Sequence, residues 1–172
     1  IAELENDFNK FPQIGFWACR DEIFGNKNSL KPLQFKGLFN PIEFLQPVFT
    51  WRYVPPPTTV AFRKTALIDA GNYDIKYRYV AEPDLYFQIL LNNYSIYQTE
   101  KLLVWRTVPD SRATAIHGNS NLYFEEWLYF LNKFKGSFVD ADYHILNEAC
   151  QYYYKCATKA IALQIINIKL QE

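Results

Sequence analysis

The spacing of apolar residues predicts a helix at the start of the chain. Apolar side chains recur there every three to four residues, which is typical of one face of an amphipathic helix, and Pro12 closes the pattern. These residues are Ile1, Leu4, Phe8 and Phe11. The next apolar stretch, "QIGFWAC" (13–19), is short and rich in aromatic and β-branched residues, so it predicts a buried strand.

The periodicity disappears between residues 20 and 57. Gly and Pro recur throughout this stretch, which ends in the triplet 55–57, and aromatic residues are interleaved with them. A disordered segment is typically poor in aromatic residues. We therefore expect a folded, irregular loop.

Regular patterns return after this loop. "TTVAFRKTALIDAG" (58–71) predicts a strand leading into a short helix, with Thr65 as the N-cap and Gly71 as the left-handed residue that ends it. A second helix is predicted from Pro83 to Asn93. "YSIYQT" and "KLLVWRT" follow as two predicted strands, separated by Glu100.

The remainder of the chain predicts helices. After a polar loop, "NLYFEEWLYFLNKF" (121–134) predicts a helix on which Phe124, Leu128 and Leu131 share a face. A long helical pattern then runs from residue 142 to about residue 170. Strands that alternate with helices favour an α/β domain. About four strands are too few for a complete doubly wound nucleotide-binding sheet.

Composition narrows the classes of function. The length of 172 residues suits one domain, and its 18 Lys and Arg balance its 18 Asp and Glu, so no net charge attracts nucleic acid. No apolar run reaches the ~18 residues that cross a bilayer. The first residues lack the segments of a signal peptide and an initiator Met, so we expect them to lie inside a longer gene product.

Cysteine and histidine positions give no metal site. Cys19, Cys150 and Cys156 are an odd number without a CxxC pair, which predicts reduced thiols in a reducing compartment. The two histidines, His117 and His144, have no cysteine at ligand spacing, so we expect no zinc site.

Four short motifs carry a resemblance to a known family. In chain order they are Arg63-Lys64, Gly71-Asn72-Tyr73-Asp74, Glu82-Pro83-Asp84-Leu85, and Trp105-Arg106 ahead of Ser111. Their order and spacing resemble the second half of the inverting, family-two glycosyltransferases of the GT-A fold. The resemblance covers roughly residues 1–112.

The resemblance implies an α/β fold of the GT-A (nucleotide-diphospho-sugar transferase-like) type. The sheet would be incomplete, lacking the N-terminal nucleotide-binding half. Residues 1–112 would form the acceptor-side part, and residues 113–172 a C-terminal helical extension. The complete enzyme would hold a divalent metal, Mg or Mn, against the sugar diphosphate. No Asp-x-Asp motif for that metal stands ahead of the four motifs, so no metal ligand is assigned.

The chain departs from the family pattern in the acidic motif and its helix. Glu82 stands in place of the more usual Asp, Pro83 in place of an aromatic residue, and Gln88 in place of a common Arg. The Gln-x-x-Arg-Trp motif of processive relatives is missing.

Glu82 is the candidate catalytic base, with Asp84 orienting it or binding acceptor hydroxyls. In an inverting transfer, a carboxylate removes the proton of the acceptor hydroxyl that attacks the anomeric carbon. The alternative is structural, because carboxylates complement the dipole at a helix N-terminus and Pro83 suits the first helical position. Glu is a poorer N-cap than Asp, Asn or Ser, so both interpretations stay open.

Five residues are assigned to substrate binding: Thr59, Arg63, Trp105, Arg106 and His117. Each Arg ends an apolar strand and could bind a diphosphate, or a carboxylate or phosphate of the acceptor, in bidentate fashion. Trp105 could stack on a sugar ring, and His117 could reach the metal or a diphosphate oxygen. The alternatives are surface ion pairs for the arginines, core packing for Trp105 and a solvated loop position for His117.

The resemblance implies a bacterial glycosyltransferase of polysaccharide biosynthesis, in the cytoplasm or at the inner face of the membrane. Its partners would be a nucleotide-sugar donor and a glycan or lipid-linked acceptor, with homo-oligomerisation left open. This chain would be the acceptor-binding, catalytic-base half, inactive without the donor-binding half. The alternatives are a non-catalytic carbohydrate-binding or protein-interaction module on the same fold, and a structural domain that recruits a partner through its long C-terminal helix.

Overall fold

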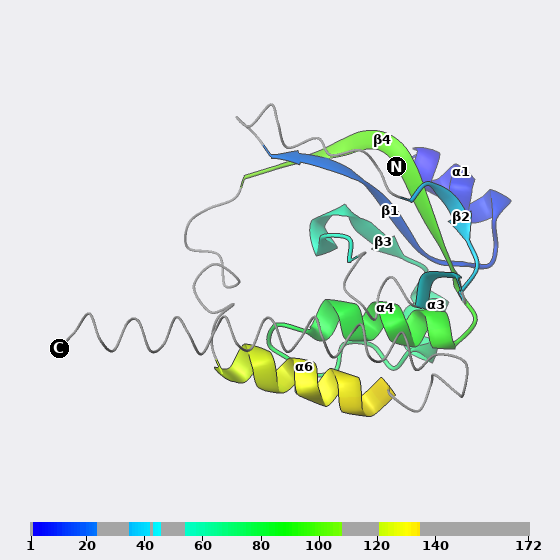
Figure 1. Cartoon of the computed structure of the whole chain (residues 1–172). Helices are drawn as coiled ribbons and strands as arrows, with labels where there is room; N and C mark the ends of the chain where they lie inside the picture. Colours follow the sequence, from blue (N-terminus) through cyan, green and yellow to red (C-terminus); the bar gives the residue numbers. More distant parts are fainter. Residues whose placement is uncertain (1, 24–34, 42, 46–53, 108–120, 135–172) are drawn as a thin grey trace. The chain divides into compact units, whose positions relative to one another are not determined.

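The fold is mixed α/β and is built on a four-stranded mixed sheet with the strand order β2-β4-β1-β3 (Figure 1). The long central strands β1 (Ile14–Ile23) and β4 (Ser95–Arg106) run parallel to each other. The short outer strands β2 (Gly37–Phe39) and β3 (Val60–Phe62) are antiparallel to their neighbours β4 and β1.

This computed structural model describes residues 2–23, 35–41, 43–45, 54–107 and 121–134. The chain divides into two compact units. The first comprises Ile1–Asp74 and Glu82–Val108, and the second comprises Ile75–Ala81 and Pro109–Glu172. The sheet lies in the first unit. The predicted domain boundary at residue 112 and the predicted long helix from residue 142 lie outside the described residues.

The strand predictions need three corrections. The predicted strand 13–19 runs on to Ile23, and β2 lies within the stretch expected to be irregular. The two strands predicted on either side of Glu100 are one continuous strand, β4. Glu100 does not interrupt it because its side chain is exposed and pairs with Lys36 at 3.3 Å.

Helix α1 (Ala2–Lys10) covers one face of the sheet and confirms the predicted N-terminal helix. Leu4, Phe8 and Phe11 pack against a buried cluster that contains Ile14 and Trp17. Helix packing of this kind follows from the apolar spacing, because residues three and four apart share one face.

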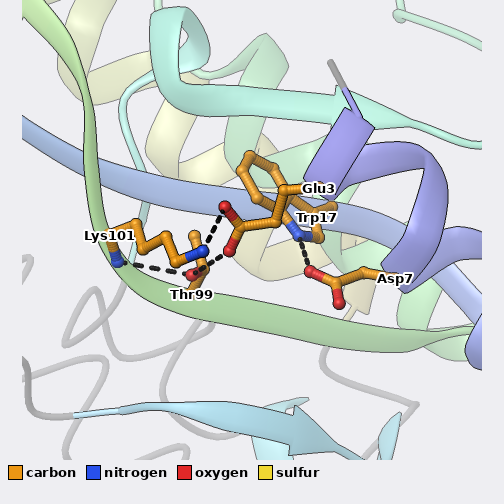
Figure 2. Close-up of polar contacts among 5 residues, drawn as sticks. All are labelled: Glu3, Asp7, Trp17, Thr99 and Lys101. Carbon is orange, nitrogen blue, oxygen red and sulfur yellow. Dashed lines mark hydrogen bonds and ion pairs between the residues drawn. The ribbon is translucent and has the colours of Figure 1, made fainter.

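Two sets of polar contacts fix α1 on the sheet (Figure 2). The buried Asp7 carboxylate accepts the indole N–H of Trp17 at 2.9 Å. Closer to the start of the helix, Glu3 pairs with Lys101 at 2.8 Å and accepts the Thr99 hydroxyl at 3.3 Å. Both sets join α1 to β1 or β4, so the helix has a fixed register on the sheet.

Helix α4 (Ala81–Leu91) packs on the other face. Consecutive strand residues point to opposite faces, so Phe16 points away from α1 where Trp17 points toward it. The Phe16 ring stacks on Tyr86 of α4 with centroids 4.9 Å apart. At Gly15 an added Cβ would lie 2.6 Å from Ile89 and 2.5 Å from Tyr94, so the end of α4 lies directly against the start of β1.

The boundaries of α4 differ from the prediction. The helix begins at Ala81 and ends at Leu91, two residues earlier at each end than predicted. Pro83 is therefore the third helical residue, where its missing N–H costs little because the first four N–H groups have no intrahelical partner. Asn93, with φ 62°, adopts the left-handed conformation after the helix, and the Tyr94 N–H closes the end on the Ile89 carbonyl.

The short helix α3 (Lys64–Asp69) follows β3 as predicted, but its cap differs. The N-cap is Arg63, without a side-chain cap, and Thr65 lies inside the helix. Gly71 is left-handed with φ 81°, as predicted. Its N–H binds the Ile68 carbonyl and that of Asn72 binds the Leu67 carbonyl, the Schellman pattern.

The described part of the second unit is the segment Ile75–Ala81 and helix α6 (Asn121–Phe134), which has the predicted bounds. Its buried face differs from the predicted one, because Leu128 is 40% exposed. The buried aromatic residues of α6 are Trp127, Phe130 and Phe134, whose rings contact one another in sequence.

Candidate functional site

The carboxyl ends of the parallel strands β1 and β4 lie next to each other at one end of the sheet. The register pairs Asp21 with Val104, Glu22 with Trp105 and Ile23 with Arg106. In α/β proteins, ligands bind outside the carboxyl ends of parallel strands, because the loops and helix starts around them leave room for a cleft. This end of the sheet is therefore the candidate position of a binding site.

Trp105 and Glu22 form a polar pair at this edge. The indole N–H of Trp105 donates to Oε2 of Glu22 at 3.2 Å, and the Trp105 side chain is 62% exposed. Glu22 thus orients the indole while its ring surface stays open to solvent. An open indole can stack on the C–H face of a sugar ring, and a carboxylate beside it can accept hydrogen bonds from sugar hydroxyls.

The start of α4 lies toward the same edge. Because the last turn of α4 contacts Gly15 at the start of β1, and Tyr86 stacks on Phe16, the helix runs antiparallel to β1. Its first turn therefore points toward the carboxyl ends of β1 and β4, as Figure 1 shows for these three elements. Glu82, the second residue of α4, therefore lies on the side of Tyr86 that faces the carboxyl ends of the two strands.

Glu82 is partly buried and has a phenol nearby. Burial, followed by the negative charge of Glu82, raises the pKa of the Tyr73 hydroxyl above its ordinary value. Tyr73 is 45% exposed and lies in the turn after α3. The Tyr73 phenol lies within reach of the Glu82 charge and is a hydrogen-bonding group that a hydroxylated ligand could use.

Asp84 lies deeper in the helix than the sequence suggested. Its side chain is only 1% exposed. A buried carboxylate needs polar or charged partners within the protein. A role in orienting other groups fits this position better than direct contact with an acceptor in solution.

Arg63 lies at the opposite end of the sheet. Because β3 is antiparallel to β1, its last residue pairs with Phe16, near the start of β1. The Arg63 Nε donates to the Ile14 carbonyl at 2.8 Å and Nη2 to the Phe8 carbonyl at 2.9 Å. The guanidinium also covers the Phe8 ring at 5.0 Å. These contacts join β3, β1 and α1. Substrate binding by Arg63 stays a prediction.

Thr59 lies beside a cavity under α1. The Thr59 side chain is 3% exposed, and its hydroxyl donates to the Pro56 carbonyl at 2.7 Å. The cavity has a volume of about 390 Å³. Its lining includes Glu3, Leu4, Trp17, Cys19, Thr59 and Val104. Burial, and then the charge of Asp21, raise the pKa of the Cys19 thiol.

Two predicted substrate-binding residues cannot be placed in this site. His117 lies outside the described residues, as does Ser111 of the fourth motif. Arg106 is the last residue of β4, and the structure does not describe its side chain.

Glu22 and Tyr73 join the candidate site only once the structure is considered. In the sequence Tyr73 belongs only to a turn motif, and the effect of the Glu82 charge on its pKa depends on how the chain folds after that turn. Glu22 gains its role from its strand partner Trp105, far along the chain. A carboxylate next to the end of a predicted strand was the available signal.

Within the described ranges, no group of three His, Cys, Asp or Glu side chains could hold a metal ion. Among the same residues, no helix is both long and apolar enough to cross a membrane. Comparison with protein-family models, with curated proteins and with solved structures finds no match.

Proposed function

We propose that this chain is the acceptor-binding, catalytic-base part of a glycosyltransferase of the GT-A type. The enzyme would transfer a sugar from a nucleotide-sugar donor to a glycan or glycolipid acceptor in polysaccharide biosynthesis. The observation that supports the proposal is the exposed Trp105 ring beside the Glu22 carboxylate, at the end of the sheet where β1 and β4 both end.

The local order of elements supports the proposal as well. A strand leads to Arg63-Lys64, a short helix follows, a left-handed Gly71 opens a turn, and Glu82 stands in the first turn of a helix. The strand after that helix ends at Trp105 and Arg106. This is the order that the resemblance to family-two glycosyltransferases implied.

The proposed reaction is a single displacement. The acceptor hydroxyl oxygen attacks the anomeric carbon of the donor sugar, and the new C–O bond forms as the bond to the diphosphate breaks. The hydroxyl proton passes to the Glu82 carboxylate, and the nucleoside diphosphate leaves with the bonding electron pair. Trp105 would stack on the acceptor ring, with Glu22 and Tyr73 binding its hydroxyls.

Donor binding is assigned to no described residue. The resemblance implies a divalent metal in the complete enzyme, but the described residues offer no group of ligands that fits one.

The test compares the turnover of Glu82→Gln with that of the wild type in the full-length protein. Turnover is measured as the release of nucleoside diphosphate from a panel of nucleotide sugars in the presence of oligosaccharide acceptors. Loss of a general base lowers kcat by a factor on the order of 10²–10⁴. Glu5→Gln, an exposed carboxylate on α1, is the control and leaves kcat unchanged. Equal turnover of Glu82→Gln and the wild type would remove Glu82 from the mechanism.

One observation favours the alternative of a non-catalytic carbohydrate-binding module. The pair of Trp105 and Glu22 can bind a sugar without any base, and Asp84 is buried. A module of this kind binds an acceptor glycan without a sugar nucleotide, and Glu82→Gln leaves that binding intact. Calorimetric titration with oligosaccharides, in the absence of a donor, separates the two functions.

A further inference from the structure

Elements of the first unit surround a cavity beneath the start of α1. Residues of α1, β1, β3 and β4 line it, together with the short 3-10 helix η1 (Pro57–Thr59), and its volume is about 390 Å³. Pockets that bind small molecules have volumes from about 300 to 1,000 Å³. Since an apolar cavity of about 150 Å³ can hold benzene, this cavity has room for a molecule of two fused rings.

The walls of the cavity are mostly apolar. Aliphatic side chains from three elements line it, and they are Ala2, Leu4, Val60, Ala61, Leu103 and Val104. The aromatic ring of Trp17 adds to this surface. A ligand that fills the cavity would therefore remove apolar surface of the protein from water, which is the main driving force for binding small molecules.

The polar groups of the lining already have partners within the protein. The indole N–H of Trp17 donates to the Asp7 carboxylate at 2.9 Å (Figure 2). The Glu3 carboxylate pairs with Lys101 at 2.8 Å, and the Thr59 hydroxyl donates to a backbone carbonyl at 2.7 Å. An uncharged apolar ligand leaves these bonds intact, so it costs the protein no hydrogen bond.

The cavity has an open rim and a buried floor. Leu103, on the rim, is 46% exposed, and Ala2 is exposed as well. The side chains of Trp17, Cys19 and Thr59 are buried. A ligand can therefore enter from solvent past Leu103 and Ala2 while the sheet and α1 stay folded.

An irregularity in the sheet shapes one wall. Arg20 pairs with Leu102 and Asp21 with Val104, so Leu103 is an extra residue of β4 between the two pairs. Consecutive residues of a regular strand point to opposite faces, whereas an extra residue changes the direction of the side chains beside it. Leu103 and Val104 both line the cavity, although they are neighbours in the chain.

The cavity is separate from the candidate site at Trp105. The register is regular from Asp21 and Val104 to Glu22 and Trp105, so these two pairs point to opposite faces of the sheet. Val104 lines the cavity on the face that α1 covers, and Trp105 points to the other face. A ligand in the cavity would not contact the Trp105 indole.

We propose that the cavity under α1 binds one small, uncharged, apolar molecule with about the size of two fused rings. Contact with the Trp17 ring and with the aliphatic walls provides the affinity. A ligand that carries a carboxylate or phosphate inside the cavity loses the hydration of its charge, so it binds more weakly. The inference does not rest on the proposed function, because the cavity lies on the other face of the sheet.

The first experiment compares two probes of the same ring size by calorimetric titration of the protein. 1-Naphthol is uncharged, and 1-naphthoate carries a carboxylate. We expect 1-naphthol to bind at one site and 1-naphthoate to bind at least about tenfold more weakly. Equal affinity for the two probes, or no binding of 1-naphthol up to its solubility limit, would overturn the proposal.

The second experiment fills the cavity with a larger side chain. Ala61 lines the cavity and pairs with Trp17, so Ala61→Leu places its added atoms in the space of the ligand. We expect the affinity for 1-naphthol to fall by at least about tenfold. Lys64→Leu, which adds an apolar side chain at an exposed position of α3, is the control and keeps the wild-type affinity.

A second filling variant protects this experiment against a failure to fold. Val104→Phe fills the cavity from β4 and carries the measurement if Ala61→Leu is unfolded. Circular dichroism and the thermal midpoint show which variants are folded. Wild-type affinity for 1-naphthol in a folded Ala61→Leu or Val104→Phe variant would exclude the cavity as the binding site.

The third experiment locates the ligand by NMR. The indole N–H resonances of Trp17 and Trp105 report on opposite faces of the sheet. Saturation with 1-naphthol should shift the Trp17 resonance and leave that of Trp105 in place. A shift of the Trp105 resonance alone would place the ligand at the candidate site and contradict the proposal.

Discussion

The carboxylate of Asp7 accepts a hydrogen bond from the indole N–H of Trp17, and both side chains are buried between α1 and the sheet. Neither partner can turn to water if the other is removed. This pair therefore ties the N-terminal helix to the central strand β1 with a defined orientation.

Replacing Asp7 by Ala leaves the Trp17 N–H buried without its acceptor. We expect the free energy of unfolding to fall by about 1–3 kcal/mol. Urea denaturation, followed by circular dichroism, measures the change. Glu5→Ala, an exposed substitution on the same helix, stays within about 0.5 kcal/mol of the wild type. A loss for Asp7→Ala no larger than that of Glu5→Ala would contradict the role of the pair.

Gly15→Ala tests the close approach of α4 to β1. The new Cβ would lie 2.5 Å from Cβ of Tyr94 and 2.6 Å from Cγ2 of Ile89, so strand and helix must separate. Overpacking of this kind costs about 1–3 kcal/mol, and the thermal midpoint should fall accordingly. A thermal midpoint equal to that of the wild type would show that α4 does not lie against Gly15.

The titration of Tyr73 tests the position of Glu82. Its phenol is neutral when protonated, so the Glu82 charge opposes ionisation and raises the pKa. Glu82→Gln removes the charge and lowers the Tyr73 pKa, although burial keeps it above the ordinary value. NMR of ¹³C-labelled tyrosine, assigned with Tyr73→Phe, follows the titration. A Tyr73 pKa that is the same in Glu82→Gln as in the wild type would show that Glu82 does not lie close enough to affect Tyr73.

The same raised pKa has a consequence for stability. A phenol with a higher pKa in the folded state favours folding while it is protonated. This contribution is complete below the unfolded pKa and is lost as the pH rises through the folded pKa. In Tyr73→Phe, the free energy of unfolding should therefore fall less steeply with rising pH in the alkaline range than it does in the wild type.

Cys19 should react slowly in the native protein. Its pKa is raised by burial and by Asp21, so little thiolate is present near neutral pH. Alkylation with iodoacetamide, read by peptide mass spectrometry, should modify Cys19 slowly in buffer and rapidly in urea. Equal rates in the two conditions would contradict the buried position of the thiol.

The exposed ring of Trp105 is predicted to contribute to the binding of an acceptor glycan. Trp105→Ala removes the exposed ring and weakens binding of an acceptor oligosaccharide by about tenfold. Leu103→Ala, which shortens another exposed side chain of the same strand, is the control. Calorimetric titration measures both variants. Equal affinities for Trp105→Ala and the wild type would exclude stacking on this indole.

The helices were predictable because their patterns are local. The apolar spacing of α1 and the bounds of α6 can be read from a few consecutive turns. The strand β2 could not be predicted in this way, since three residues carry no periodicity and their pairing with β4 makes them a strand. Continuity of β4 through Glu100 likewise depends on partner strands.

The candidate site was predictable only in part, for the same reason. Glu82 and Trp105 stand out because each marks the end of a regular element. Glu22, the partner that orients Trp105, is distant from it in sequence, and nothing in the local pattern connects the two residues. The antiparallel course of β3, which places Arg63 at the opposite end of the sheet, also follows only from strand pairing.

Because β1 pairs with β4, the central pair of the sheet cannot form until late in synthesis at the ribosome. β1 is made early, but the strand beside it emerges only after β2, β3, α3 and α4. Until Arg106 has left the exit tunnel, the side of β1 that pairs with β4 has no partner strand, and the apolar residues of β1 stay exposed. Contacts between distant residues form slowly, and such an edge is prone to aggregation. A nascent chain stalled before Ser95 should therefore depend on chaperones more strongly than one stalled after Arg106.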